Sequence, residues 1–196
     1  GAWIMIDDWS KRVPVQLLTR ERLTRAQRRT LLANYLVMLS VVAIAAVPGS
    51  EDGGVVVATA AGSLTRIDAS GTTELFVVPA ADGAPGGVAV AADGTVFVSV
   101  ARGVLEVVGG SAAVVVDADD ERLGATPGAV AVDADGAVYL ADVDTNRILR
   151  RDTDGDVRVV AGTGEPAPSG APTGDGEPAD EVPIGAPVGL AVGGDG

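Results

Sequence analysis

The sequence predicts a mainly β fold built from a unit of about 42 residues, preceded by a short basic segment and an apolar one. Two copies of the unit are visible at residues 86–98 and 128–140, each an apolar run, an Asp-Gly pair and a second apolar run. Repeats of about 40–45 residues made of short strands are typical of β-propeller blades. We therefore expect a partial β-propeller of antiparallel four-stranded blades.

The first element is a basic segment over residues 1–30. It carries seven Lys and Arg residues against three acidic ones, although the whole chain has a formal net charge of −13. Residues 15–33 are expected to form a basic juxtamembrane helix. The partner expected for this charge is an anionic membrane surface, because an uncharged apolar run follows directly.

That apolar run, Leu31–Val47, contains 17 residues and no charge. About 17–25 apolar residues can cross a bilayer as a helix, so the run is predicted to be a transmembrane helix or signal anchor. Basic residues on its N-terminal side favour a cytoplasmic N-terminus and an extracytoplasmic chain beyond the span. The alternatives are a cleaved export signal, a buried core helix or a pair of strands, because a run this short is ambiguous.

The third predicted element, residues 48–196, is the incomplete propeller. Val, Ile, Tyr and Phe fill its apolar runs, which suits strands of a half-buried sheet. Residues 64–76 align with residues 148–160 at an offset of 84, which is twice the repeat. The pairs Asp93-Gly94, Asp135-Gly136 and Asp154-Gly155 are predicted to be hairpin turns of type I′, in which glycine supplies a positive φ.

The clearest blade lies between Pro127 and Gly164. Its predicted strands are Val130–Val132, Ala137–Ala141, Arg147–Arg151 and Val157–Ala161. A further strand is expected to start at Leu190, with Gly194-Asp195-Gly196 as its turn. We therefore expect about two blades and the start of a third, within a longer protein that has more blades.

The stretch from Pro127 to Gly164 resembles the NHL repeat, a family of β-propeller blades. The residues that match its pattern are Pro127, Gly128, Val130, Asp133, Gly136, Tyr139, Ala141, Asp142, Asn146, Arg147 and Ile148. The family often has Asn-His-Arg where this chain has Thr-Asn-Arg. The Gly- and Pro-rich tail after Gly162 is similar to the inter-blade loops of extracellular NHL propellers.

The resemblance implies a structural role for six residues of the repeat pattern. These residues are Asp133, Gly136, Tyr139, Asp142, Asn146 and Arg147. Asp142 and Arg147 are expected to tie adjacent strands at a blade corner, because a guanidinium group can bind a carboxylate in bidentate fashion.

Two acidic stretches are candidates for calcium, which prefers several oxygen ligands from one loop. One is the run of Asp117, Asp119, Asp120 and Glu121; its alternative interpretation is a solvated loop. The other is the stretch 152–156, which lacks the spacing of an EF-hand and is more simply a polar hairpin turn. No other cofactor is predicted.

The composition restricts the chemistry. The chain has no cysteine and no histidine, so disulfides and histidine-dependent sites are absent from this sequence. No nucleophile–base pair or phosphate-binding glycine loop is evident, and no catalytic residue is assigned. From residue 48 onward, seven arginines face 24 acidic residues, which disfavours nucleic acid as a partner.

Two functions remain open. The preferred hypothesis is an extracytoplasmic propeller of a single-pass membrane protein, which binds a protein or small-molecule ligand at its loops as a sensor or scaffold. The alternative is an exported propeller enzyme, similar to lactonases or lyases, whose catalytic residues lie mostly outside this sequence.

Overall fold

The computed structural model describes residues 3–4, 13–14, 41–49, 54–117, 119–124, 127–168 and 176–193. The chain divides into two compact units, residues 1–40 and 41–196. In the first unit, β1 (Trp3–Ile4) pairs antiparallel with β2 (Val13–Pro14). The helix predicted for residues 15–33 lies outside the described residues.

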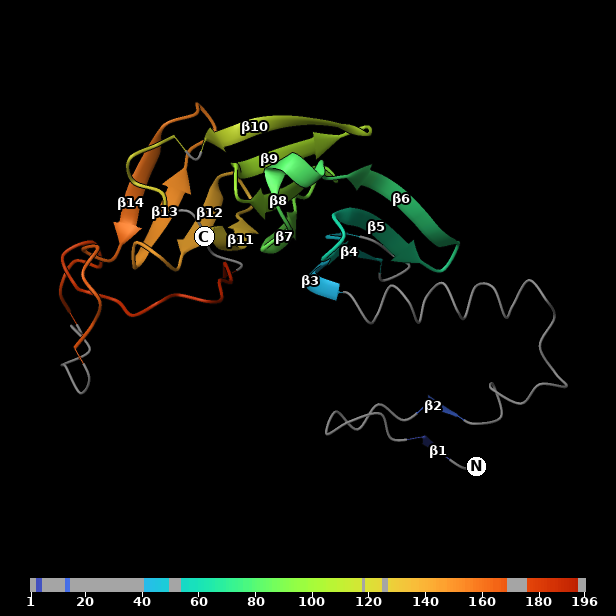
Figure 1. Ribbon diagram of the computed structural model, residues 1–196, viewed down its shortest axis with the longest axis horizontal. Helices are drawn as coiled ribbons and strands as arrows, with labels where there is room; N and C mark the ends of the chain where they lie inside the picture. The colour runs from blue at the N-terminus through green and yellow to red at the C-terminus, as the bar shows by residue number, and fades with distance from the viewer. Residues whose placement is uncertain are drawn as a thin grey trace, which may run out of the picture. The chain divides into compact units, whose positions relative to one another are not determined.

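The described part of the second unit contains three four-stranded antiparallel sheets, in which each strand pairs with its neighbour in the sequence (Figure 1). We call them blade 1, blade 2 and blade 3. Blade 1 comprises β3 (Val41–Ala46), β4 (Val55–Thr59), β5 (Ser63–Asp68) and β6 (Gly71–Val77). Blade 2 comprises β7 (Gly87–Val90), β8 (Val96–Val100), β9 (Gly103–Val108) and β10 (Ser111–Asp117). Blade 3 comprises β11 (Pro127–Val132), β12 (Val138–Asp142), β13 (Arg147–Arg151) and β14 (Val157–Ala161).

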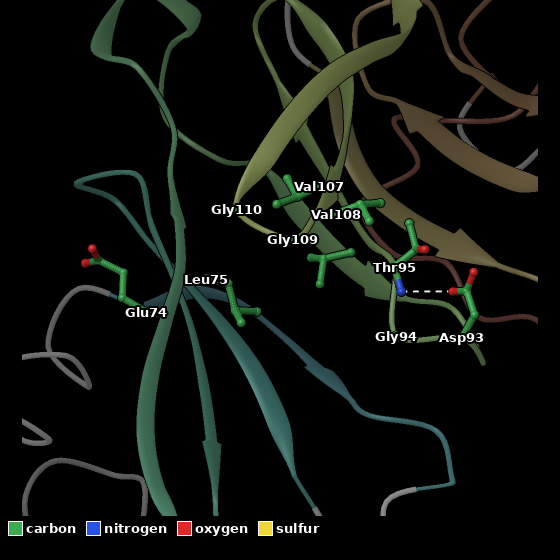
Figure 2. Close-up of a pocket in the computed structure, with 10 residues that line it drawn as sticks. Glu74, Leu75, Asp93, Gly94, Thr95, Val107, Val108, Gly109 and Gly110 are labelled. Carbon is green, nitrogen blue, oxygen red and sulfur yellow. Dashed lines mark hydrogen bonds between the residues drawn. The ribbon is translucent and has the colours of Figure 1, made fainter.

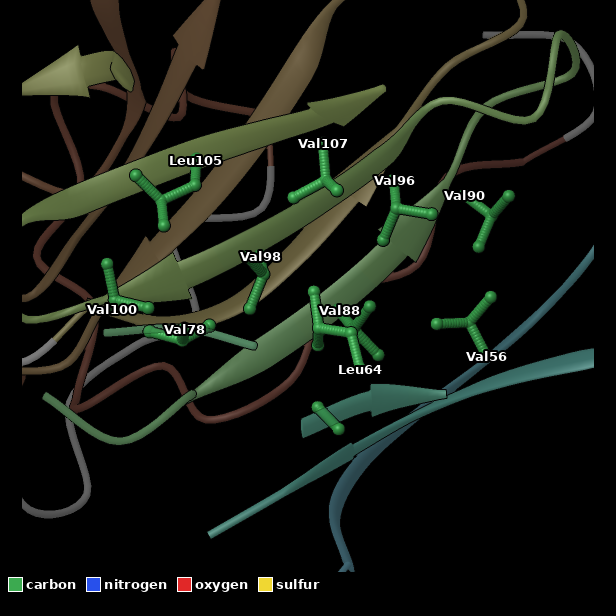
Figure 3. Close-up of a cluster of buried hydrophobic side chains, with 11 residues drawn as sticks. Val56, Leu64, Val78, Val88, Val90, Val96, Val98, Val100, Leu105 and Val107 are labelled. Atoms are coloured by element: carbon green, nitrogen blue, oxygen red, sulfur yellow. The ribbon is translucent and has the colours of Figure 1, made fainter. Parts of the chain in front are cut away.

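The core lies between the blades, because the middle strands carry apolar side chains on both faces. Between blades 1 and 2, Val56 and Leu64 pack against Val88, Val98 and their neighbours (Figure 3). Between blades 2 and 3, Phe97 of blade 2 packs against Leu140 and Leu149 of blade 3. Burying a side chain of this size contributes about 1.5–3 kcal/mol before entropy is counted, so the blades stabilise one another.

The structure corrects the predicted start of the propeller. Val41–Ala46 form strand β3, which pairs with β4, so the prediction of a helix over Leu31–Val47 is wrong for these residues. Ala43, Ala45 and Val47 pack against the core, so this part of the apolar run belongs to the propeller. Residues 31–40 lie outside the described residues. No helix among the described residues is long and apolar enough to cross a membrane.

The repeat concealed this strand because one loop of blade 1 is longer. Eight residues, 47–54, separate β3 from β4, whereas five residues separate the first two strands of blades 2 and 3. The insertion moves β3 out of the 42-residue register. The described propeller therefore has three complete sheets, beginning at residue 41, instead of two blades and the start of a third beginning at residue 48.

The Asp-Gly hairpin turns lie where they were predicted, but they are not of type I′. The Asp133 N–H donates to the Ala137 carbonyl at 3.0 Å, and the Gly136 N–H donates to the Asp133 carbonyl at 3.2 Å. Gly136 has φ 91°, while Asp135 has no positive φ. This is a three-residue loop, a type I turn closed by a glycine. The Asp133 carboxylate selects it by accepting the N–H groups of Asp135 and Ala137.

All three outer strands contain a β-bulge at the same place. The pairing register skips Leu75 in β6, Val115 in β10 and Val160 in β14. In each case the skipped residue lies opposite the bond between two consecutive residues of the neighbouring strand, and these two residues occupy equivalent positions in the three blades. A bulge redirects side chains and leaves backbone groups out of the ladder, so these three residues mark equivalent points at the rim of each blade.

The strand expected at Leu190 is not formed. Residues 183–193 have no assigned secondary structure, and no described strand pairs with them. A strand is stabilised by its ladder of hydrogen bonds to a partner, which this segment lacks within the described residues.

Candidate functional site

A cleft of about 570 Å³ lies between blades 1 and 2 (Figure 2). Its walls come from the outer strand of blade 1, from the turn before β8 and from the hairpin that joins β9 to β10. The lining residues are Glu74, Leu75, Asp93, Gly94, Thr95, Val96, Val107, Val108, Gly109 and Gly110. The volume lies within the range of about 300–1,000 Å³ that small-ligand sites occupy, and the lining combines apolar side chains with a few polar groups.

Local structure places each wall. Leu75 is the bulge residue of β6, and Figure 2 shows its side chain on the side of the strand that faces β9. Gly109 and Gly110 form a two-residue hairpin loop with φ 56° and 82°, which is the type I′ geometry that favours glycine. A Cβ added at Gly109 would meet no atom within 4 Å, so this side of the cleft is open.

Two of the lining residues, Asp93 and Glu74, carry carboxylates, but their side chains point in different directions. The Asp93 carboxylate accepts the Thr95 N–H at 2.9 Å, and this hydrogen bond lowers the pKa of Asp93 below its usual value. Asp93 is therefore charged at neutral pH. Glu74 projects from the opposite side of β6 to Leu75, as Figure 2 shows, and accepts the Ser63 hydroxyl at 3.4 Å. The Glu74 carboxylate is thus turned away from Leu75, and the Asp93 carboxylate is held against Thr95 in the turn before β8.

The next interface shows why the cleft exists. Val107 pairs with Val96 in blade 2, and Arg151 pairs with Val138 at the equivalent place in blade 3. The Arg151 Nε–H donates to the carbonyl of the bulge residue Val115 at 3.0 Å, so its side chain spans the gap between blades 2 and 3. Because Val107 is too short to reach across, the corresponding space between blades 1 and 2 stays open.

Asp142, one of the predicted structural residues, is completely buried. Its carboxylate accepts three backbone N–H groups, from Gly124, Asp144 and Thr145. A carboxylate with several N–H donors organises a turn and tolerates burial. Gly124 belongs to the segment between blades 2 and 3, so Asp142 fastens this segment to blade 3.

Asn146 and Arg147 have separate partners. Asn146 adopts φ 51° and accepts the Ala186 N–H at 2.9 Å, while Arg147 donates to the Thr163 carbonyl at 3.2 Å. The expected Asp142–Arg147 pair is therefore not the arrangement in the structure, because backbone N–H groups already occupy the Asp142 carboxylate. Both Asn146 and Arg147 hold the segment that follows β14.

Asp133, Tyr139 and Arg150 form a cluster on the opposite face of blade 3. The Arg150 guanidinium lies 5.5 Å from the centre of the Tyr139 ring and 3.6 Å from the Asp133 carboxylate. Arg150 also pairs with Asp152, which lies 3.4 Å from Arg158 as well. Asp152 thus bonds to two arginines within a polar hairpin turn.

The acidic run after β10 does not converge on one point. Asp120 bonds to Arg122, whose side-chain hydrogen bond lowers the pKa of Asp120, and Asp117 accepts the Asp119 N–H. Asp119 and Glu121 are exposed. Among the described residues, no group of three or more acidic, His or Cys side chains is close enough to hold a metal ion.

The sequence reasoning missed the cleft between blades 1 and 2. Its apolar walls, Leu75 and Val107, look like ordinary strand residues. The signal that could have found it is the comparison of equivalent positions in the repeat, because blade 2 has valine where blade 3 has Arg151.

Comparison with known proteins supports the fold alone. No family model matches the chain, and no curated protein matches it. A structural genomics protein of unknown function from Bacteroides thetaiotaomicron matches with a TM-score of 0.56 and 19% identity, over 75% of this chain and 40% of its own. Virginiamycin B lyase from Staphylococcus aureus matches with a TM-score of 0.50 and 21% identity, over 61% of this chain and 40% of its own.

An auxiliary nutrient binding protein from Bacteroides thetaiotaomicron matches with a TM-score of 0.50 and 7% identity, over 62% of this chain and 30% of its own. This chain thus spans 40% or less of the length of the three structures. The matched structures are propeller-like, so the class of fold is a β-propeller-like arrangement of four-stranded antiparallel blades.

Proposed function

We propose that this chain is part of an NHL-like propeller that acts as a binding domain outside the cytoplasm, with the cleft between blades 1 and 2 as its ligand site. The observation that carries the proposal is the cleft itself, which is open, partly apolar and formed on rigid strands. The NHL assignment is supported by the residues from Pro127 to Gly164 that match that repeat.

The location outside the cytoplasm is supported by the resemblance to surface propellers, not by a membrane span at Leu31–Val47. Residues 41–46 of that run form a strand of blade 1, so they are not available for a helix across the bilayer. Digestion of intact cells that express the full chain, with an added protease and a cytoplasmic marker, tests the location. Complete protection of the chain in intact cells would contradict it.

Binding can be tested by NMR on the full chain with labelled Val and Leu methyl groups. The probes are the N-acetyl amides of the common amino acids, a panel of monosaccharides and a panel of aromatic lactones. We expect at least one probe to shift the methyl signals of Leu75, Val107 and Val108. If no probe shifts them, the cleft is not a ligand site of these classes and the proposal fails.

A pair of variants separates the cleft from the general surface. Val108 and Val77 are both exposed, with 57% and 50% of their surfaces accessible, but only Val108 lines the cleft. Val108→Trp should fill the cleft and weaken binding, whereas Val77→Trp should leave it unchanged. The same spectra test the alternative function: product signals from a lactone, with or without calcium, would favour an enzyme over a binding domain.

A further inference from the structure

We propose that the cleft between blades 1 and 2 receives an arginine side chain from a partner peptide. The partner's guanidinium would occupy the place that Arg151 fills between blades 2 and 3. This inference rests on the proposed function, because it names the ligand class of the same site.

The first argument is that the protein already contains the same interaction within its own chain, between blades 2 and 3. Between blades 2 and 3, the Arg151 stem crosses the gap and its Nε–H binds the bulge carbonyl of Val115. A bulge residue is skipped by the register of the ladder, so its carbonyl can accept a donor from outside the blade. The interface between blades 2 and 3 thus demonstrates that this geometry accepts a guanidinium group.

The second argument is that blade 1 repeats the acceptor but blade 2 lacks the donor. Leu75 is the bulge residue equivalent to Val115, and its carbonyl oxygen lies 3.8 Å from the position of a Cβ on Gly110, beside the cleft. Val107 stands where blade 3 has Arg151. In the described ranges, no side chain donates to the Leu75 carbonyl, so an incoming guanidinium would supply the missing donor.

The third argument is chemical complementarity. Leu75, Val107 and Val108 provide apolar walls for the three methylene groups of an arginine, which commonly pack on such surfaces while the charged end finds polar partners. Asp93 adds a carboxylate that is ionised at neutral pH. The 24 acidic residues beyond residue 47, against seven arginines, give a negative field that attracts a cation.

The probe for the test is N-acetyl-arginine amide, titrated into the full chain while the Leu75, Val107 and Val108 methyl signals are recorded. Its matched control is N-acetyl-citrulline amide, which has nearly the same shape without the charge, and N-acetyl-lysine amide provides a point charge. We expect the arginine probe to bind most tightly of the three, and we expect its affinity to fall as the salt concentration is raised. Equal binding of the citrulline probe, or tighter binding of the lysine probe, would overturn the proposal.

Two carboxylates provide a matched pair of variants. Asp93→Asn keeps the oxygen that accepts the Thr95 N–H but removes the charge, and it should weaken the arginine probe about two- to fivefold, as expected for a partly exposed ion pair. Asp154→Asn likewise keeps the oxygen that accepts the Asp156 N–H but removes a charge outside the cleft lining, and it should leave the affinity unchanged. Equal effects of the two substitutions would show that only the overall field acts, and would contradict the site.

Another pair of variants tests whether an arginine of the chain itself can occupy the cleft. Val107→Arg places in blade 2 the residue that blade 3 has at the equivalent position, and it should abolish probe binding. Val77→Arg adds the same charge at an exposed position outside the cleft and should leave probe binding in place. Because Val107 is buried, Val108→Arg provides a second test if the first variant does not fold. Failure of the arginine probe alone, while other probes still bind the cleft, would overturn this inference and leave the proposed function intact.

Discussion

The two interfaces between neighbouring blades have the same strand geometry but different chemistry. Four hydrogen bonds link blade 2, or the segment that follows it, to blade 3: Ser99 to the Gly128 carbonyl, Arg122 to the Val157 carbonyl, Gly124 to Asp142, and Arg151 to the Val115 carbonyl. Between blades 1 and 2, no side chain of one sheet hydrogen-bonds to the other in the described ranges. That interface consists of the apolar cluster, the cleft and one ion pair, in which Asp82 of the segment after blade 1 lies 3.6 Å from Arg102 of blade 2.

Two substitutions within the repeat account for much of this difference. The last residue of β12 is Asp142, and the equivalent residue of β8 is Val100, which is 1% exposed. Likewise Arg151 of β13 is replaced by Val107 in β9. The blade framework therefore tolerates either a polar or an apolar interface, because the backbone ladders lie within each sheet and the interface is left to side chains.

The largest effect is expected when a carboxylate is placed in the apolar interface. Val100→Asp should lower the free energy of unfolding by about 4 kcal/mol or more, because the buried charge would have no partner. In blade 3 the Gly124 N–H binds the Asp142 carboxylate, but the Gly83 N–H, in the segment before blade 2, already donates to the Ala80 carbonyl and is not free to bind a new carboxylate. Chemical denaturation of the full chain measures this, with the exposed Val77→Asp as a control that should change stability by about 0.5 kcal/mol or less. Equal effects of the two variants would contradict the contrast between the interfaces.

Removing the carboxylate from the polar interface should cost somewhat less. Asp142→Ala leaves three N–H groups without their acceptor and should lower the free energy of unfolding by about 3 kcal/mol. Asp142→Asn retains an acceptor oxygen and should lose less. If the alanine variant is as stable as the parent in urea, the N–H groups find other acceptors and Asp142 is not the fastening residue.

Arg151→Ala should have a smaller effect on stability and a new effect on binding. The loss of one charged hydrogen bond is expected to reduce the free energy of unfolding by about 1.5 kcal/mol. The variant should also open a second cleft, so that N-acetyl-arginine amide shifts the methyl signals of Val115. A variant that loses stability but never responds to the probe at Val115 would show that the bulge carbonyl does not bind a guanidinium group supplied by another molecule.

The smallest effect concerns acid. Arg122 lowers the pKa of Asp120 in the folded protein, so the pair stabilises the fold fully above the unfolded-chain pKa of about 3.9. This contribution is lost as the pH falls through the lower folded pKa. Arg122→Gln should therefore lose less stability than the parent between pH 5 and pH 2, when thermal unfolding is measured at both values. A parallel decline of the two proteins would show that the pair does not couple to protonation.

Most of the blade architecture could be predicted from the sequence because it depends on local chemistry. The apolar runs, the aspartate that caps each turn and the glycine that closes it are visible in blade 3, and four of its predicted strands match β11 to β14 closely. Strand β3 could not be found in this way. Its composition suits a membrane helix as well as a strand, and a longer loop removes it from the repeat.

The sequence by itself determined the period, the strand-rich composition, the polar residues of blade 3 and the acidic charge of the propeller region. The tertiary structure alone decided that Val41–Ala46 belong to a sheet, because a strand is defined by the partner that completes its ladder. It also decided which turn type the Asp-Gly pairs adopt and where the Asp142 carboxylate binds. The cleft is the clearest case, since it arises only when Leu75 of one blade and Val107 of the next face each other across an interface, which depends on how the two blades pack.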